Sequence, residues 1–195
     1  MSVDPLVPDE FVTFPLTVDG VPREVTARWS ESLLTVLRDR LGVRGPKTGC
    51  AHGRCGACAV RVGVGPDEPH VLCACLVPAA TAVGATVETI ASLGGPDGEL
   101  SDVQEAFLAE GAVQCGICTA GFVTAATELL ERTECPSRTE IEEALYGNLC
   151  RCTGYGRIVA AVESAARTRR ERKDPVPLTT PKLTASLRTG PEAAE

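Results

Sequence analysis

Cysteine content constrains this chain more than any other feature of its sequence. Ten of its 195 residues are cysteines, whereas only two are histidines. A chain of this length can build an apolar core without a disulfide framework, and Met1 to Ser30 contain no basic segment followed by an apolar one of the kind that directs secretion. We therefore expect a cytoplasmic protein whose reduced thiols bind metal. Sites made almost only of thiolates favour zinc or iron–sulfur clusters.

The first group of cysteines has the spacing of plant-type [2Fe-2S] sites. Cys50, Cys55 and Cys58 follow the pattern C-x4-C-x2-C, and glycines between and before them allow the tight turns that such a loop needs. A fourth thiolate is expected from Cys73 or Cys75. Because alternate residues of a strand share a face, both thiols can point to the same side. Spacing therefore leaves the choice between them open.

A second group consists of two cysteine pairs in the C-terminal half. Cys115 and Cys118 are predicted at the start of a long helix, and Cys150 and Cys152 at the start of the last helix. Helix N-termini favour an anionic cluster, so four thiolates are expected to meet between these helices. Zinc held by four cysteines is the alternative at either site. Cys135 belongs to neither group and is interpreted as a bystander.

Hydrophobic periodicity predicts an α+β unit over residues 11–92. Apolar residues alternate on both sides of an Asp19-Gly20 turn, which predicts a β-hairpin. Leucines that recur every four residues after Ser30 predict a helix with one apolar face, and further short strands follow. A Gly- and Pro-rich linker over 94–98 is expected to end this unit.

Residues 100–170 are predicted to form a bundle of about four helices. Ser101 is expected to cap the first of them, a longer helix is expected over 119–131, and a Thr139 and Glu142 capping box predicts a short third helix. The last helix is expected to begin near Gly154. Residues 174–195 form a Pro-, Thr- and Ala-rich tail, which we expect to be disordered or to lie on a partner.

Charge and hydropathy exclude two classes of partner. Nineteen basic residues against 26 acidic ones give a formal charge of −7, which offers no overall electrostatic support for nucleic-acid binding. Apolar runs are too short to cross a bilayer, so no membrane association is expected. A protein partner is the better expectation for this chain.

Four segments, taken in their order along the chain, resemble the small iron–sulfur subunit of the xanthine dehydrogenase and aldehyde oxidoreductase family of molybdenum hydroxylases. The run Gly-Asn-Leu-Cys-Arg-Cys-Thr-Gly-Tyr is the most specific of them. The sequence departs from the family pattern at Ala120, where proline is usual, but alanine is a good helix former and does not disturb ligation. The four segments are Gly49 to Cys58, Ala74-Cys75-Leu76, Gln114 to Phe122 and Gly147 to Tyr155.

The resemblance implies a fold and a set of ligands. It implies a ferredoxin-like β-grasp domain followed by an all-α four-helix domain, each holding one [2Fe-2S] cluster. It selects Cys75 over Cys73, and it implies that Gln114 and Cys152 contact a molybdopterin bound by a separate large chain. The implied cluster ligands are Cys50, Cys55, Cys58 and Cys75 in the first domain and Cys115, Cys118, Cys150 and Cys152 in the second.

The resemblance also implies a function and partners. Electrons would pass from the molybdopterin centre on a large subunit through both clusters to FAD on a medium subunit, in a dimer of heterotrimers. The substrate site would lie on another chain, and purine, aldehyde, N-heterocycle and carbon monoxide oxidation all stay open, with a slight preference for a purine or heterocycle. Two other functions remain as alternatives: a zinc-binding interaction module without a redox role, and a free-standing ferredoxin.

Overall fold

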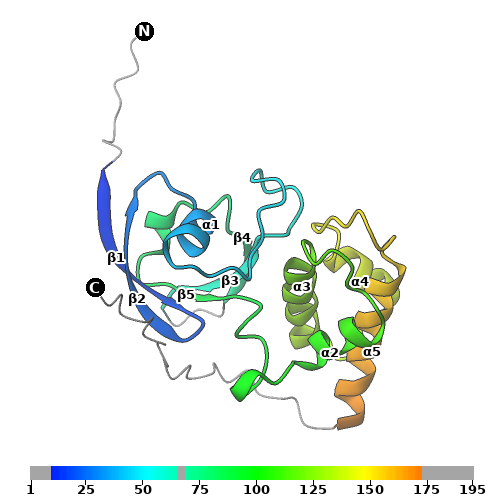
Figure 1. Ribbon diagram of the computed structural model, residues 1–195. Helices are drawn as coiled ribbons and strands as arrows, with labels where there is room; N and C mark the ends of the chain where they lie inside the picture. Colours follow the sequence, from blue (N-terminus) through cyan, green and yellow to red (C-terminus); the bar gives the residue numbers. More distant parts are fainter. Residues whose placement is uncertain (1–9, 66–68, 173–195) are drawn as a thin grey trace, which may run out of the picture.

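A five-stranded mixed sheet forms the N-terminal half of the protein (Figure 1), in a computed structural model that describes residues 10–65 and 69–172. The spatial order of the strands is β2-β1-β5-β3-β4, in which β1 and β5 run parallel and the other neighbours run antiparallel. The predicted hairpin is confirmed, and the positive φ angles of Asp19 (49°) and Gly20 (76°) make its tight turn. The strands are β1 (Phe11–Val18), β2 (Val21–Arg28), β3 (Ala59–Gly63), β4 (His70–Cys73) and β5 (Thr86–Glu88).

A short helix covers one face of this sheet. It consists of α1 (Leu33–Thr35) and a wider turn, η1 (Val36–Arg40), in which the Leu41 N–H donates to the Val36 carbonyl at 3.0 Å. The predicted cap, Ser30, is wrong, because the Ser32 hydroxyl accepts the Thr35 N–H at 3.2 Å. The apolar core beneath the helix includes Leu33, Leu37, Phe14, Leu16 and Val60.

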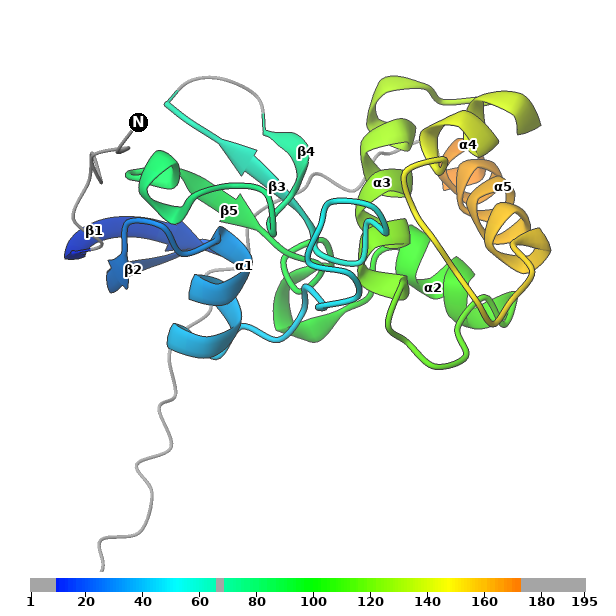
Figure 2. The same ribbon diagram turned by 90° about the horizontal axis from the view of Figure 1, so that it is seen from above.

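Four helices build the C-terminal half, as the periodicity predicts (Figure 2). The Ser101 cap is confirmed and forms a capping box with Gln104. The third helix begins earlier than predicted, because Ser137 and Glu140, not Thr139 and Glu142, form its capping box. These helices are α2 (Asp102–Ala109), α3 (Thr119–Arg132), α4 (Arg138–Ala144) and α5 (Gly156–Arg172).

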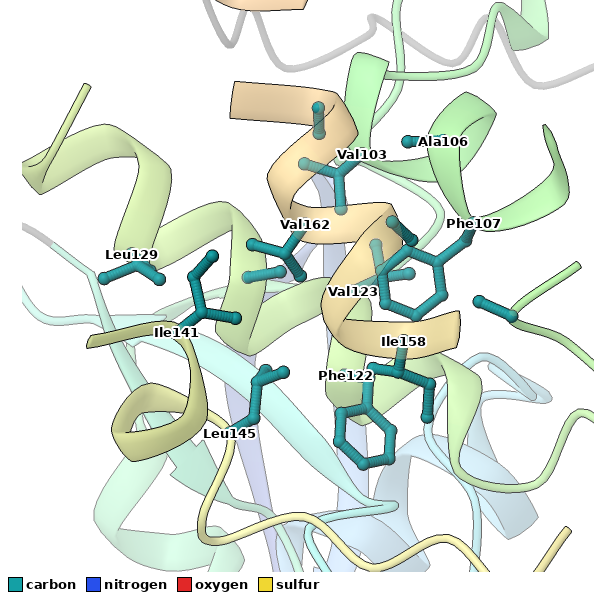
Figure 3. Close-up of a cluster of buried hydrophobic side chains, with 14 of the residues drawn as sticks. Val103, Ala106, Phe107, Phe122, Val123, Leu129, Ile141, Leu145, Ile158 and Val162 are labelled. Atoms are coloured by element: carbon teal, nitrogen blue, oxygen red, sulfur yellow. The ribbon is translucent and has the colours of Figure 1, made fainter. Parts of the chain in front are cut away.

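Each half has its own apolar core. Figure 3 shows the helical core, in which Phe107, Phe122, Ile141 and Ile158 are fully buried between the four helices. Leu93 packs into this second core from the segment that joins the two halves. This joining segment contains the short turn η3 (Pro96–Gly98), and another short turn, η2 (Ala79–Ala82), precedes β5.

The second face of the sheet packs against the helical domain. Val60 and Val62 of β3 point into the core of the first domain, whereas the residue between them, Arg61, faces α3. Contacts join α3 to both β3 and β4, and Figure 2 shows α3 beside these strands. Within the described residues, the protein has no helix long and apolar enough for a membrane span. The tail predicted over 174–195 lies outside the described residues.

Candidate metal centres

The loop between η1 and β3 carries the first three thiols. It wraps tightly because Ala51, Gly53 and Gly56 adopt positive φ angles of 57°, 69° and 67°. Gly49 also has no room for a side chain, since a Cβ there would lie 2.7 Å from the Cys55 sulfur. The glycines that the sequence analysis singled out therefore shape this loop. Cys75 reaches the same loop from the segment after β4.

Backbone N–H groups of the loop point at sulfur atoms. Two of them, those of His52 and Arg54, donate to the Cys50 sulfur at 3.3 Å each. The N–H of Gly53 donates to the Cys75 sulfur at 3.2 Å. The donation from His52, with that from Arg54, lowers the pKa of Cys50 to about 6. The loop is thus built to stabilise thiolates, which are the form that binds metal.

The four thiols of this first site meet as two pairs. Cys50 interacts with Cys55 at the exposed end of the loop, and Cys58 interacts with Cys75 deeper in the domain. Burial raises the pKa of Cys58 to about 12, so its thiolate needs compensating positive charge. A cluster with two iron ions supplies that charge, and each pair of thiolates suits one iron.

Cys73 lies close to this site, but it does not share the hydrogen bonds from loop N–H groups to the Cys50 and Cys75 sulfurs. It ends β4, pairs in register with Ala59, and packs partly buried against the core of the first domain. Its thiol also interacts with Cys58, and burial raises its pKa. The Gly53 N–H, however, is directed at Cys75. The hydrogen bond from Gly53 therefore favours Cys75 as the fourth ligand, although both Cys73 and Cys75 pack against the core of the first domain.

The second site gathers its thiols between two helices, as expected. Cys118 directly precedes α3, and the Cys115 sulfur lies 3.5 Å from the Cys152 sulfur in the loop before α5. Cys118 in turn interacts with Cys150. Burial raises the pKa of Cys118 to about 12. The second site therefore repeats the two-pair arrangement of the first.

Cys150 is held by its neighbours in the loop. Burial acts to raise its pKa, but the Thr153 hydroxyl and N–H, at 3.1 and 3.4 Å from the sulfur, together with the Cys152 N–H at 3.4 Å and the Cys118 thiol, outweigh burial and lower the pKa to about 7. The Tyr155 hydroxyl accepts the Cys150 N–H at 3.0 Å, and its ring packs edge-on against Phe122 of α3. Sequence reasoning gave Thr153 and Tyr155 no role, although both lie in the most specific run of the sequence.

Gln114 and Cys152 belong to one exposed part of the helical domain. Both residues are exposed, and Cys152 meets the thiol of Cys115, the neighbour of Gln114 in the chain. Ile117 and Leu149 add apolar surface there, with exposed fractions of 47% and 54%. A large cofactor on a partner chain could reach this surface. By contrast, Cys135 contacts Arg170 of α5 and joins neither site.

The two sites are connected by a direct contact between the domains. The Leu149 N–H donates to the Cys55 carbonyl at 3.0 Å, so residues next to one site bond to a residue of the other. The buried Asn148 packs against Gly56, and so does Gly121 of α3. Asn148 and Gly121 lie in two of the four family-like segments, but only the fold reveals that both meet the first loop.

The donor sets fit two-iron clusters. Each site offers four thiols in two pairs, with N–H and hydroxyl donors aimed at sulfur, which suits the negative charge of a cysteine-ligated cluster. Over residues 10–65 and 69–172, no three His, Cys, Asp or Glu side chains are gathered around the position of a single metal ion.

Comparison with known families matches both domains. A family model described as "2Fe-2S iron-sulfur cluster binding domain" covers residues 16–80, and one described as "[2Fe-2S] binding domain" covers residues 86–163. Together they span most of the chain. The expected α+β fold with two [2Fe-2S] domains is therefore confirmed.

Comparison with individual proteins gives relatives that match over nearly their whole length. The chain is 44% identical to the nicotine 6-hydroxylase small subunit of Paenarthrobacter nicotinovorans, over 81% of this chain and 92% of that protein. It is 40% identical to the iron-sulfur-binding subunit of xanthine dehydrogenase from Escherichia coli, over 82% of this chain and 98% of that protein. The crystal structure of quinoline 2-oxidoreductase from Pseudomonas putida 86 superposes with a TM-score of 0.74 at 34% identity, covering 83% of this chain and 97% of that one.

Proposed function

Because the chain belongs to the small iron–sulfur subunits of the xanthine dehydrogenase and aldehyde oxidoreductase family, we propose that it relays electrons from a molybdopterin on a large subunit to FAD on a medium subunit. The chain is the electron-transfer subunit of an oxidoreductase complex. When bound, its two [2Fe-2S] clusters supply one-electron chemistry. The protein itself binds the clusters, sets their surroundings and holds them at a fixed separation.

The ligand sets of the proposal are the two groups of four thiols. The N–H bonds to Cys50 and Cys75 support the first set, and the short Cys115–Cys152 contact supports the second. Hydrogen bonds to sulfur, burial and local charge tune the potentials of such clusters. The proposed ligands are Cys50, Cys55, Cys58 and Cys75 for the first cluster and Cys115, Cys118, Cys150 and Cys152 for the second.

One observation carries the proposal furthest, namely the hydrogen bond between the two thiol sites. From Cys55, covalent bonds lead to its carbonyl, which accepts the Leu149 N–H at 3.0 Å, and Leu149 is bonded to Cys150. A short path of covalent bonds with one hydrogen bond thus joins a proposed ligand of each cluster. This path supports electron transfer between the two domains.

We propose the order of the relay from the family resemblance, and the exposed surface of the helical domain supports it. We assign the contact with molybdopterin to Gln114 and Cys152, because both are exposed beside the second thiol site. The ferredoxin-like domain then faces the FAD-binding subunit. We further propose a cytoplasmic dimer of heterotrimers.

The substrate class of the complex is proposed from the relatives. Their names refer to nicotine, xanthine and quinoline, which are all nitrogen heterocycles. We therefore propose an N-heterocycle, hydroxylated at the molybdenum centre of the large subunit, as the substrate. An aldehyde or carbon monoxide would be the alternative within the same family.

Gentle purification of the tagged chain from the cells that produce it tests this proposal. We expect it to come with two larger chains, molybdenum and FAD, at the native mass of a dimer of heterotrimers, and we expect an N-heterocyclic substrate to reduce its clusters. A chain that carries clusters but purifies alone would indicate a free-standing ferredoxin. A colourless chain that binds zinc would indicate an interaction module.

A further inference from the structure

A buried arginine lies between the two domains. Arg61 is in β3, and its side chain is only 8% exposed. Its guanidinium lies 3.1 Å from the Glu88 carboxylate of β5, which is its partner in the same sheet. It also donates to both carboxylate oxygens of Glu131 in α3, at 2.8 and 3.2 Å. Arg61 therefore has one acidic partner in its own domain and one across the domain boundary.

Stability alone gives little reason for a charge at this position. An apolar residue would pack a helix against a sheet at least as well, because the attraction within a buried ion pair is little larger than the free energy needed to remove the two charges from water. The Arg61 Nε atom is buried and has no hydrogen-bond partner among the described residues, which adds to the cost. Unlike apolar packing, this ion pair favours one relative position of helix and sheet, because the Arg61 guanidinium and the Glu131 carboxylate must face each other to form two hydrogen bonds.

The Arg61–Glu131 pair and the Gly121 contact hold opposite ends of α3. Near its N-terminus, Gly121 packs against the carbonyl of Gly56 in the first cysteine loop. Ten residues later, or about 15 Å along the helix, Glu131 is held by Arg61. Between these two contacts lies a groove of about 240 Å³, lined by Leu72 and Cys73 of the β4 strand together with residues of α3.

This arrangement explains why a second attachment is needed. Contacts with β3 and β4 hold α3 on the sheet, but the groove leaves part of its length unpacked, so α3 keeps some freedom to tilt about the close contact at Gly121. Any pivot of α3 moves Cys118, which directly precedes it, and strains the hydrogen bond between Leu149 and Cys55. A contact at the far end removes that freedom.

We propose that Arg61 is a positioning residue that, through Glu131, fixes the orientation of the helical domain relative to the ferredoxin-like domain. It thereby keeps the Cys55 carbonyl and the Leu149 N–H in register, and with them the separation of the two thiol sites. The consequence for electron transfer rests on the proposed function. The orientation itself can be tested apart from it.

Two variants with matched chemistry separate this role from general stability. Glu131→Ala and Glu88→Ala each remove one carboxylate from Arg61, but only the first breaks the link between the domains. Hydrogen exchange of the peptide that contains Leu149 reports the contact with Cys55 in the full, cluster-loaded chain. Electron paramagnetic resonance of the reduced protein reports the magnetic interaction between the clusters, which depends steeply on their separation and relative orientation.

In Glu131→Ala we expect severalfold faster exchange at Leu149 and an altered magnetic interaction, whereas Glu88→Ala should match the parent chain in both. Glu131→Gln keeps the shape of the side chain and one neutral hydrogen bond, so its exchange rate and magnetic interaction should lie between those of Glu131→Ala and Glu88→Ala. It replaces Glu131→Ala if that variant fails to fold. Unchanged exchange and magnetic interaction in the Glu131 variants, or equal changes in Glu88→Ala, would overturn the proposal. Absence of cluster signals from the parent chain would instead refute the proposed function, and the exchange comparison would still decide the role of Arg61.

Discussion

In a Cys75→Ser variant, we expect the cluster of the ferredoxin-like domain to be lost while the helical cluster remains. The Cys75 sulfur accepts the Gly53 N–H of the first loop and faces Cys58, so its loss leaves three thiolates for a centre that needs four. Iron should fall from about four to about two atoms per chain, since each [2Fe-2S] cluster holds two. Iron analysis, with electron paramagnetic resonance of the reduced protein, measures both effects on one sample.

The chain provides its own controls for this variant. Cys73→Ser removes a thiol that packs against the core and lies near the same site, and Cys135→Ser removes an exposed thiol beside Arg170. Both should retain two clusters. If Cys73→Ser loses a cluster while Cys75→Ser keeps both, the fourth ligand is Cys73 and the assignment is reversed.

The second large effect is expected from Gly121→Ala, which should destabilise the protein at the contact between the two domains. Alanine is about 1 kcal/mol better than glycine in a helix, so propensity alone predicts a more stable protein. A Cβ at this position would, however, lie 2.1 Å from the Gly56 carbonyl oxygen and 2.8 Å from the Asn148 side-chain nitrogen. Because backbone cannot yield as a flexible side chain can, steric conflict should win and cost about 1–3 kcal/mol of unfolding free energy.

A nearby glycine supplies the matched control for Gly121→Ala. Gly147 has no atom within 4 Å of an added Cβ, and its φ is not positive. Gly147→Ala should therefore leave the unfolding midpoint and the cluster signals close to those of the parent chain. Denaturant unfolding compares the two variants, and a Gly121→Ala protein as stable as the parent would contradict the close contact between the domains.

Local signals in the sequence predicted much of the fold. The Asp19-Gly20 turn fixes a hairpin through two neighbouring residues, and Ser101 with Gln104 forms a capping box within four residues. Such features depend on short stretches of chain, and the hairpin and the Ser101 cap appear where expected, whereas the capping box expected at Thr139 and Glu142 is formed by Ser137 and Glu140. Where two serines or threonines compete for a cap, as at Ser30 and Ser32, the packing of the leucines that follow decides, and sequence alone chose wrongly.

Long-range geometry was harder to predict. Spacing indicated which cysteines belong together, but not that Cys115 pairs with Cys152 across the helices. Nothing near Arg61 in the sequence predicts that its partner is Glu131, seventy residues away. An isolated charge in an apolar strand can signal a buried ion pair, yet its partner becomes identifiable only when the second domain packs on the sheet.

The most direct test of the account is the amount of iron and acid-labile sulfide per chain, measured with low-temperature electron paramagnetic resonance of the dithionite-reduced protein. Two cysteine-ligated [2Fe-2S] centres predict about four iron and about four sulfide, with two distinct S = 1/2 signals. Zinc without labile sulfide in freshly prepared anaerobic protein would contradict the account and make the chain a structural module.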